Sequence, residues 1–471
     1  MTFSSTIFLF FFLPITVIGY YLIRSELKNL FLLVASLLFY AWGEPRLVCL
    51  LMGSILVNYL LALRIEPRRE RASGKAYVAV MLLWNFGVLF YYKYLAFAVT
   101  NVNAAFGTSI SIPDIALPLG ISFFTFRAVS YCLDVYWGTS AAQLNPINTA
   151  LYISFFPQVT MGPIARYGEF ETQLKDRKVS IDSLSDGGKR IVVGLAKKVI
   201  LADQLGIMVD AVFSTPGTGR TAMAAWMAAI AYTLQIYYDF SGYSDMAIGI
   251  GQLFGFHFSE NFDKPYTSKS LSEFWRRWHI SLGTWFRDYV YIPLGGSRVK
   301  SQSRRIWNLF VVWVLTGLWH GAAWNFLAWG LLNFAVIAFE KVAKIPQKLK
   351  RPLGRYAYQA FTMLTVMFGW VFFRAAGLKN GLVYLACMFG FMGNAVCTEA
   401  DLYIIQSNWV ILVIGVICCI PLPARLKQNS LIDSRSFVID MLNPLWYAVL
   451  YIVGIAFAIG GTYQAFIYFN F

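Results

Sequence analysis

The sequence has few charged residues, few histidines and no cysteine arrangement typical of metal binding. Charged residues make up 13% of the 471 residues and hydrophobic residues 58%, whereas a soluble domain usually carries about 25% charged residues. The low charge content excludes an ordinary soluble globular protein. It predicts an all-α integral membrane protein, because a helix satisfies its own backbone hydrogen bonds in lipid.

Several motifs of soluble enzymes are also missing. The chain contains no Gly-x-Ser-x-Gly elbow, no Walker A loop and no His-Glu-x-x-His motif. The three histidines lie far apart without a carboxylate cluster at ligand spacing, so we expect no metal site and no bound cofactor. The six cysteines show no ligand spacing and mostly lie in apolar runs, where packed thiols are expected rather than disulfides.

Long apolar runs predict a polytopic protein with roughly 10–13 membrane crossings, at ~20 residues for a full crossing. Several runs are shorter and are expected to form re-entrant or buried helices. Residues 1–471 show no internal repeat, so we expect a single membrane domain with its central motifs in residues 230–340. The expected helical segments are residues 7–23, 29–42, 48–63, 77–99, 117–137, 150–161, 191–213, 222–254, 306–319, 322–339, 356–373, 381–396, 409–422 and 445–468.

The basic residues are distributed unevenly. Lysine and arginine total 39 against 24 acidic residues, a formal net charge of +15. Nucleic-acid binding would also explain this excess, but the basic residues lie in loops between apolar runs, which fits cytoplasmic loops and anionic membrane lipids better. This rule places residues 64–75, 264–305 and 341–355 in the cytoplasm, while Arg374 and Lys379 disturb the alternation.

His320 is a titratable residue inside an apolar segment. Residues 306–339 are bracketed by two basic loops, so we expect a hairpin entered and left from the cytoplasm, with His320 near its tip. A continuous helix would put four side chains of this segment on one face: Trp313, Thr316, His320 and Trp324. An ionisable residue at membrane depth is costly, so a catalytic role is favoured over a core histidine satisfied by a nearby carbonyl.

His279 lies in a second segment rich in aromatic residues, residues 270–291. A helical wheel gives one apolar and one polar face, which predicts an amphipathic helix at the cytoplasmic side of the membrane, started by a capping box of Ser270 and Glu273. Burial would keep the imidazole neutral and able to accept a proton, and a structural role is the alternative. The apolar face has five members: Trp275, Trp278, His279, Leu282 and Phe286.

A third segment, residues 235–245, places two carboxylates and several hydroxyls inside an apolar run. Such an interruption is tolerated at membrane depth where the backbone lines a cavity or is buried in protein. Asp239 and Asp245 are therefore candidates to orient a histidine, to bind a substrate hydroxyl or to pair with an arginine, and equally candidates for helix caps at a kink. Arg276 and Arg277 on the polar face are candidates to bind phosphate groups of a ligand, although contact with lipid explains the same charges.

Three of these segments together resemble motifs of the membrane-bound O-acyltransferase family. They are Phe274-Trp-Arg-Arg-Trp-His-Ile-Ser281, Tyr238-Asp-Phe-Ser-Gly-Tyr-Ser-Asp245 and Leu318-Trp-His-Gly321. The similarity covers nearly the whole chain and is strongest to the bacterial branch, whose members act on alginate, cellulose, peptidoglycan or teichoic acid. By this resemblance His320 matches the family's near-invariant catalytic histidine. His279 matches a second motif position that is histidine in bacterial members and often asparagine in eukaryotic ones.

The resemblance implies a ring of helices around a thin central region, with a funnel or tunnel that reaches the catalytic histidine. It implies an O-acetyltransferase that takes an acetyl group from cytoplasmic acetyl-CoA and delivers it to an extracytoplasmic polysaccharide, directly or through a periplasmic or extracellular partner protein. We expect a multi-pass protein of the bacterial cytoplasmic membrane. His320 and His279 are the predicted catalytic residues, and the predicted substrate-binding residues are Asp239, Asp245, Trp275, Trp278, Arg276, Arg277, Trp319 and Asn325.

Two other functions are compatible with the same segments. Broken helices and buried polar groups also suit a transporter or flippase without chemistry of its own, although the paired repeats usual in transporters are not visible. A structural subunit of a synthase complex would tolerate loss of His320. The sequence leaves the acceptor open among alginate, cellulose, peptidoglycan, another glycan and a hydroxyl of a partner protein.

Overall fold

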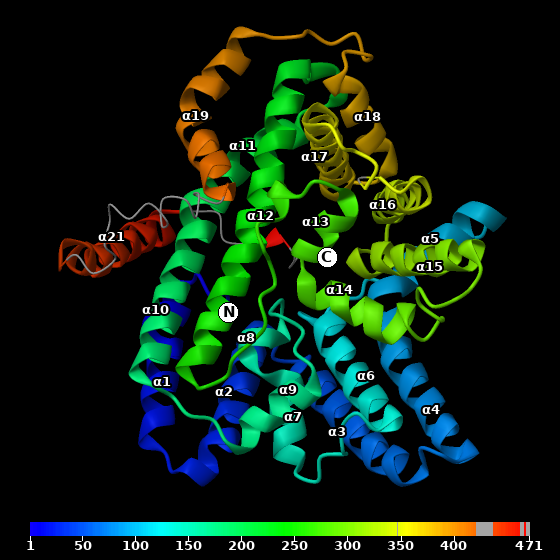
Figure 1. The fold of residues 1–471 in the computed structure, drawn as a ribbon, viewed down its shortest axis with the longest axis vertical. Coiled ribbons are helices and arrows are strands. Elements are labelled where there is room, and N and C mark those ends of the chain that lie inside the picture. Colours follow the sequence, from blue (N-terminus) through cyan, green and yellow to red (C-terminus); the bar gives the residue numbers. More distant parts are fainter. Residues whose placement is uncertain (346, 421–436, 462–465, 468–471) are drawn as a thin grey trace. The chain divides into compact units, whose positions relative to one another are not determined.

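The computed structural model describes residues 1–345, 347–420, 437–461 and 466–467, and it is almost entirely helical (Figure 1). Within these residues the only β pairing is an isolated bridge between Phe262 and Trp278. The all-α prediction is therefore confirmed. Residues 421–422, 462–465 and 468, which belong to the ends of two expected segments, lie outside the described residues.

The chain divides into two compact units, Met1–Ile191 with Tyr243–Ser259, and Val192–Gly242 with Glu260–Phe471. In the first unit, α3, α4 and α6 pack against one another. A reciprocal amide pair joins α3 to α4, because Asn58 Nδ2 donates to Asn85 Oδ1 at 3.1 Å and Asn85 Nδ2 donates to Asn58 Oδ1 at 2.7 Å. The helices of this unit are α1 (Leu13–Leu22), α2 (Lys28–Gly43), α3 (Val48–Ile65), α4 (Ala72–Leu89), α5 (Leu95–Phe106), α6 (Ile121–Trp137), α7 (Pro146–Ser154), α8 (Phe156–Val159) and α9 (Tyr167–Lys175).

The helix expected over residues 150–161 is interrupted. α7 ends at Ser154, and Phe155 has a ψ of 117°, outside the helical range, before the single turn of α8. Pro157 lies in that first turn, where its missing N–H is tolerated. The same proline inside a continuous helix would remove a backbone hydrogen bond, so the chain restarts instead.

The second unit contains the histidine segments. Two helices, α10 (Ile181–Ala196) and α12 (Ala222–Leu253), begin in one unit and end in the other. The other helices of the second unit are α11 (Asp203–Ser214), α13 (Leu271–Arg277), α14 (Ile280–Phe286), α15 (Gln302–His320), α16 (Trp324–Ala343), α17 (Pro352–Arg374), α18 (Leu378–Met388), α19 (Glu399–Cys419) and α21 (Phe437–Gly460).

α12 is continuous through the polar segment 235–245, so the alternative that Asp239 and Asp245 cap helices at a kink is wrong. Asp239 does not need to cap a broken helix, because its carboxylate accepts a hydrogen bond from Lys198 Nζ at 2.8 Å and from Ile467 N at 2.9 Å. Lys198 is fully buried and also pairs with Asp203 at 2.7 Å. A buried charge is tolerated where it is paired and hydrogen-bonded, and these long-range partners satisfy that condition.

Six helices are long and apolar enough to cross a membrane among the described residues, which confirms a multi-pass membrane protein. This number is lower than the predicted 10–13 crossings. α6 has only 17 residues and α12 contains the polar segment, so neither qualifies by length and composition. The six segments are Ser25–Gly43, Val48–Arg68, Ala72–Phe106, Trp324–Ala343, Pro352–Arg374 and Glu399–Cys419, and Phe8–Leu22 and Pro444–Gly460 are shorter apolar helices.

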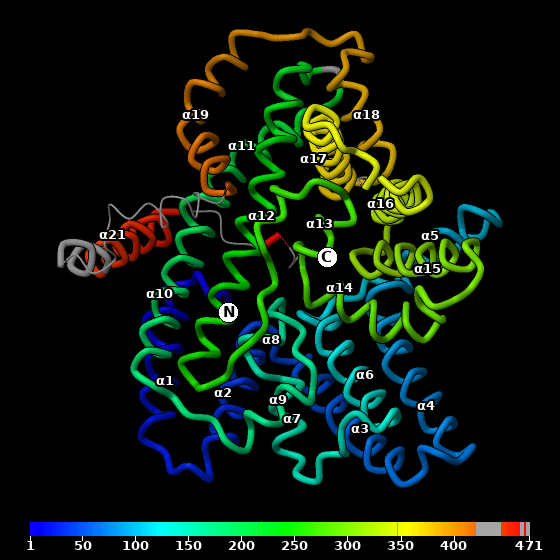
Figure 2. Tube along the Cα trace, in the orientation of Figure 1, coloured from blue at the N-terminus to red at the C-terminus, as the bar shows by residue number. Residues whose placement is uncertain are grey.

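α15 and α16 form the expected hairpin, and Figure 2 follows the chain through it. The helices approach closely at two glycines: a Cβ atom on Gly330 would lie 2.6 Å from Trp313 O and 3.3 Å from Gly317 Cα. α15 ends at His320, so the prediction that Trp324 shares its face is wrong, and Trp324 instead begins α16 and is exposed.

The ends of this hairpin differ in charge. α15 begins beside Arg304 and Arg305, and α16 ends beside Lys341, so this is called the basic end. α17 follows directly after Lys350 and Arg351, and it packs against α16. Its last turn is fixed at the opposite end, called the hairpin end, because Asn325 Nδ2 donates to Phe372 O at 3.0 Å and to Ala375 O at 3.1 Å.

Candidate active site

The helix predicted over residues 270–291 is broken at His279, where φ is 45° and the backbone is left-handed. The preceding segment holds this break open. Asp263 N donates to Arg277 O at 2.9 Å, and Ile280 N donates to Asn261 O at 2.9 Å. These hydrogen bonds replace those a continuous helix would make, so the prediction of one amphipathic helix is wrong and α13 and α14 are separate.

The amide of Asn261 determines which nitrogen of the His279 ring carries the proton. Asn261 Oδ1 accepts from Ser281 N at 3.2 Å and from Ser281 Oγ at 2.9 Å, so it is an acceptor. His279 Nδ1 lies 3.1 Å from the same oxygen and therefore donates to it. Nε2 is then the ring nitrogen with a lone pair. Burial lowers the pKa of His279 from 6.5 to about 3, so this ring is neutral at neutral pH.

His320 is the last residue of α15 and is buried. Its ring packs edge-on against Trp329 and Phe373, with centroid distances of 4.8 Å and 5.0 Å. The Trp319 ring contacts both imidazoles, at 4.9 Å from the His320 ring and 6.2 Å from the His279 ring. Two histidines from different sequence motifs are thus joined through one indole.

His279 and His320 line the same cavity, which has a volume of about 550 Å³. α13, α14, α15 and α16 supply its walls. The apolar part of the lining includes Trp278 and Trp313, and Thr316 adds a hydroxyl one turn before His320. A volume in this range suits a small-molecule ligand, and two imidazoles give the cavity groups that exchange protons.

Three cationic side chains line the same cavity: Arg276, Arg287 and Lys341. No aspartate or glutamate of the described residues is part of this lining. Asp288, outside the lining, binds Arg287 with an Nε–Oδ1 distance of 2.7 Å. The cavity therefore carries an excess of positive charge, which favours an anionic ligand such as a phosphate.

Glu340 anchors the start of α13 and was missed by sequence reasoning. Its carboxylate accepts from Leu271 N at 2.7 Å and from Ser272 N at 2.9 Å, where the helix N-terminus favours a negative charge. Ser270 caps the same helix by accepting from Glu273 N at 3.1 Å, whereas the Glu273 carboxylate accepts from Lys269 N at 2.9 Å, so one half of the predicted capping box is formed. Glu340 could have been recognised from the sequence as a carboxylate at the end of an apolar run. A carboxylate in that position needs a hydrogen-bonding or charged partner.

Trp275 is fixed by a second residue that sequence reasoning missed, Asn333. Trp275 Nε1 donates to Asn333 Oδ1 at 2.8 Å. The indole ring packs edge-on against Trp313 at 5.1 Å and Trp329 at 5.3 Å between centroids. Edge-to-face packing is a favourable arrangement of aromatic rings, and two of these indoles, Trp275 and Trp313, line the cavity.

The eight predicted substrate-binding residues separate into two groups. Trp275, Trp278 and Arg276 line the cavity of the two histidines. Asp239, Arg277, Trp319 and Asn325 lie in the same unit without lining it, and Asp245 belongs to the first unit. Within the described residues, no three His, Cys, Asp or Glu side chains come together as a metal-ligand set.

The residues outside the cavity have partners of their own. Asp245 binds Arg190 with an Oδ1–Nη2 distance of 3.0 Å. Arg277 binds Glu273 one helical turn earlier at 2.9 Å. Together with the contacts of Asp239 and Asn325 described above, these ion pairs and hydrogen bonds hold helices in place.

Comparison with known proteins identifies the family of the chain. The sequence profile of the membrane-bound O-acyltransferase family matches residues 141–385. A probable alginate O-acetylase of Azotobacter vinelandii is 43% identical over 401 residues, 83% of this chain and 78% of the relative. A peptidoglycan O-acetyltransferase of Helicobacter pylori is 32% identical over 523 residues, 100% of this chain and 98% of the relative. A teichoic acid D-alanyltransferase of Bacillus subtilis is 31% identical over 242 residues, 47% of this chain and 60% of the relative.

The apolar helices and the cavity with its two imidazoles, taken with these similarities, define a membrane-embedded acyl-transferring enzyme. The chain belongs to the membrane-bound O-acyltransferase family. This membership decides against the two alternatives considered from the sequence, a transporter without chemistry and a structural subunit.

Proposed function

We propose that this protein transfers an acetyl group from cytoplasmic acetyl-CoA to a polysaccharide hydroxyl on the other side of a bacterial cytoplasmic membrane, directly or through a partner protein. The observation that carries the proposal is that His279, His320 and three cationic side chains line one and the same cavity. Relatives named alginate O-acetylase and peptidoglycan O-acetyltransferase support a polysaccharide of the cell envelope as the acceptor class.

The cations of the cavity suit the phosphates of the donor. Arg276 and Arg287 belong to the segment that the charge rule assigns to the cytoplasm, and Lys341 lies at the basic end of α16. Guanidinium and ammonium groups form charge-assisted hydrogen bonds with phosphate oxygens. Trp275, Trp278 and Trp313 line the same cavity, so the uncharged thioester arm would lie against apolar side chains.

The histidines supply the proton transfers. The hydroxyl oxygen of the acceptor attacks the thioester carbonyl carbon, the C–S bond breaks, and an ester and a thiol are formed. In this proposal His320 accepts the hydroxyl proton during the attack and returns it to the departing thiolate. His279 presents the lone pair of Nε2, so it contacts an N–H or O–H of the bound substrate and acts as an acceptor.

The test is acetyl transfer by purified protein in detergent or liposomes. Acetyl-CoA radiolabelled in the acetyl group is supplied with oligosaccharide fragments of alginate or peptidoglycan, and loss of thioester and gain of labelled glycan are measured. Since general base catalysis contributes roughly 10²–10⁴-fold, His320→Ala should lower the rate by that factor.

A matched control is available in the first unit. His257 is exposed and takes no part in the cavity, so His257→Ala should leave the rate unchanged. Equal yield and equal thermal stability of the two variants would show that the His320 effect is chemical. An active His320→Ala protein, or movement of a glycan without any acetyl transfer, would contradict the proposal.

A further inference from the structure

A second cavity, of about 350 Å³, lies in the second unit between the end of α11, the loop before α12, the end of α17 and α18. Neither His279 nor His320 lines this cavity, so it is distinct from the candidate active site. Most of its surface is apolar. The polar side chains of the lining include two guanidinium groups and two hydroxyls, those of Arg220, Arg374, Ser214 and Thr215.

This cavity lies at the hairpin end, where an apolar helix long enough to cross a membrane stops. That span is Pro352–Arg374, so Arg374 is its last residue. The head groups of lipids lie at the level where a span ends, and long basic side chains extend to them. α18 packs against α17 and supplies Val383 to the cavity, while the neighbouring Leu382 is exposed. The cavity is therefore placed at the depth of lipid head groups.

The charge of this cavity is positive. Arg220 and Arg374 line it, whereas no carboxylate of the described residues does. Asp210, outside the lining, forms an ion pair with Arg374, but no described carboxylate pairs with Arg220, which is only 6% exposed. A buried charge costs free energy unless a counter-charge accompanies it. An anionic ligand in the cavity would supply that counter-charge.

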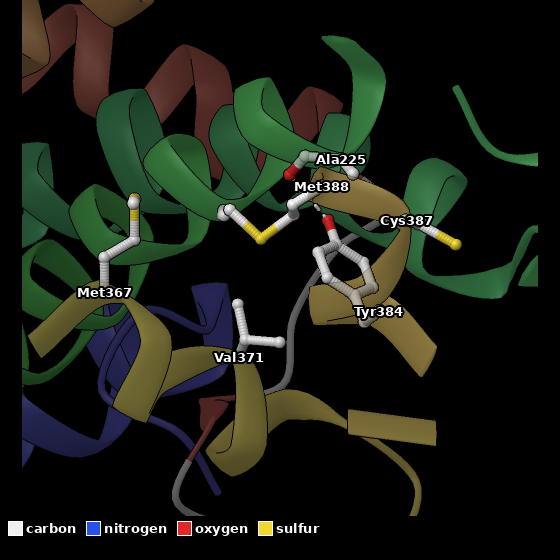
Figure 3. Packing of buried hydrophobic residues seen from close by; sticks show 7 residues of the cluster. Ala225, Met367, Val371, Tyr384, Cys387 and Met388 are labelled. Atoms are coloured by element: carbon white, nitrogen blue, oxygen red, sulfur yellow. Dashed lines mark hydrogen bonds between the residues drawn. The ribbon is translucent and has the colours of Figure 1, made fainter. Parts of the chain in front are cut away.

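The guanidinium of Arg220 is held in a fixed position. It lies over the Tyr384 ring, 4.3 Å from the centroid. The Tyr384 hydroxyl donates to Ala225 O at 3.0 Å, and Figure 3 shows it pointing to that carbonyl within a buried cluster. The guanidinium also donates to three backbone carbonyls, those of Val212 at 3.1 Å, Phe213 at 3.2 Å and Thr215 at 2.5 Å.

The loop that carries Arg220 is fixed to α18 as well. Cys387 Sγ donates to Gly217 O at 3.3 Å, and Asn394 Nδ2 donates to Arg220 O at 2.9 Å. A Cβ atom on Gly217 would lie 2.7 Å from Val383 Cγ1, so a glycine permits this close approach. This side of the cavity is therefore preorganised.

Arg374 is the cation of the cavity that can exchange its partner. Both Arg374 and Asp210 are more than one third exposed, and an ion pair in contact with solvent contributes little to stability. The planar guanidinium fork matches two oxygens of a phosphate group. A phosphate that enters the cavity can therefore compete with Asp210 for Arg374.

The two hydroxyls of the cavity suit a ligand that donates hydrogen bonds. Ser214 Oγ donates to Ala211 O at 3.1 Å, and Thr215 Oγ1 donates to the same oxygen at 3.0 Å. Each hydroxyl has a single hydrogen, so both oxygens can offer a ligand only their lone pairs. A ligand that joins a phosphate to hydroxyl groups of its own satisfies the guanidinium groups and these lone pairs together.

We propose that this cavity binds the head group of an anionic phospholipid that carries hydroxyl groups, such as phosphatidylglycerol. Arg374 and Arg220 face the phosphate, and Ser214 and Thr215 accept from the head-group hydroxyls. Basic pockets between membrane helices are a known means of binding anionic head groups. The volume is at the lower end of the range for ligand sites, which fits a head group whose acyl chains stay in the bilayer.

The lipid would also support the candidate active site. Phe373 immediately precedes Arg374, and its ring contacts the His320 ring with a centroid distance of 5.0 Å. A lipid that holds Arg374 therefore holds the turn of α17 that packs against this imidazole. The binding itself does not depend on the proposed acetyl transfer.

The experiment measures thermal unfolding of the purified full-length protein in detergent while phosphatidylglycerol is added. The lipid should raise Tm in a saturable way that gives an apparent Kd. Loss of a charged hydrogen bond should raise this Kd about tenfold in Arg374→Gln, and Arg374→Lys should recover part of the loss. Lys379→Gln removes the same charge from an exposed position outside the cavity and should leave Kd unchanged. Phosphatidylcholine has the phosphate but no net charge and no hydroxyl, so it should bind at least about tenfold more weakly.

Asp210→Asn makes the test independent of folding. Removing the competing carboxylate should lower the Kd for phosphatidylglycerol, which is opposite to the effect of Arg374→Gln and cannot result from general loss of structure. Glycerol phosphate carries the same head group without acyl chains, and binding as tight as that of the lipid would assign the cavity to a soluble phosphate and overturn the inference. Equal stabilisation of the wild type by the two lipids, or the same direction of change in both variants, also overturns it.

Discussion

Asn261 provides a direct test of the role of His279, because its Oδ1 accepts three hydrogen bonds, from His279 Nδ1, Ser281 N and Ser281 Oγ. Asn261→Leu removes this acceptor and lets the imidazole adopt the other tautomer. One buried hydrogen bond contributes about 0.5–1.5 kcal/mol, so the productive tautomer and kcat should fall about 2- to 10-fold. Loss of all three bonds should lower the free energy of unfolding by about 1.5–4.5 kcal/mol.

Asn261→Asp separates the proton position from stability. The carboxylate keeps an acceptor at Nδ1, but its negative charge raises the pKa of His279 above the wild-type value of about 3. Between pH 5 and 8 His279 of the wild type stays neutral, so its protonation should not affect the wild-type rate. The variant should lose activity as pH falls through the raised pKa, because Nε2 then carries a proton.

The measurement is the pH profile of kcat for acetyl transfer. Ser281→Ala is the matched control, because it removes the Ser281 Oγ bond to the same oxygen and leaves the His279 contact in place. Its profile should match that of the wild type. If Asn261→Asp also keeps the wild-type profile, acceptance of a hydrogen bond by His279 Nε2 does not contribute to the rate-limiting step and the reasoning fails.

Three further predictions concern the donor, the hairpin and pH. Lys341→Gln should raise KM for acetyl-CoA about 5- to 10-fold through loss of a phosphate contact, while Lys348→Gln, an exposed lysine outside the cavity, should not; steady-state kinetics decide. Gly330→Ala should lower the free energy of unfolding by about 1–3 kcal/mol, because its Cβ would lie 2.6 Å from Trp313 O, whereas Gly354→Ala, with no contact nearer than 3.5 Å, should be neutral in a thermal unfolding assay. His279 should make the protein less stable as pH falls from 6.5 towards 3, by about 1.4 kcal/mol per pH unit, because the unfolded histidine takes up a proton and the buried one does not; His279→Gln should remove this part of the slope.

Composition and motifs are local properties of the sequence. They were enough to predict the all-α class and to select His279 and His320, which the structure brings to one cavity. They did not predict the break at His279, since the segment from Ser270 to Leu282 contains neither proline nor glycine and its apolar face fits a helical wheel. The break depends on hydrogen bonds from residues 261–263, which no local pattern reveals. Long-range backbone hydrogen bonds therefore interrupt a segment whose own sequence is compatible with a continuous helix.

The partner of Asp239 could not be predicted for a related reason. A carboxylate in an apolar run signals a cavity or a partner, and only the fold shows that the partner is Lys198. Hydropathy by itself does not distinguish lipid-facing from protein-facing side chains, so the number of crossings stays a prediction. α6 illustrates this, since most of its apolar residues are buried against protein.

The left-handed backbone at His279 limits which amino acids can occupy that position, whatever the chemistry requires. A residue with an ordinary side chain pays about 1–2 kcal/mol for this conformation, while histidine and asparagine are among the types found there most often. The resemblance implies histidine in some family members and asparagine in others at the matching position. Both residue types tolerate the left-handed backbone conformation found here. Replacing histidine by asparagine at this position therefore removes the imidazole while the backbone conformation between α13 and α14 can stay the same.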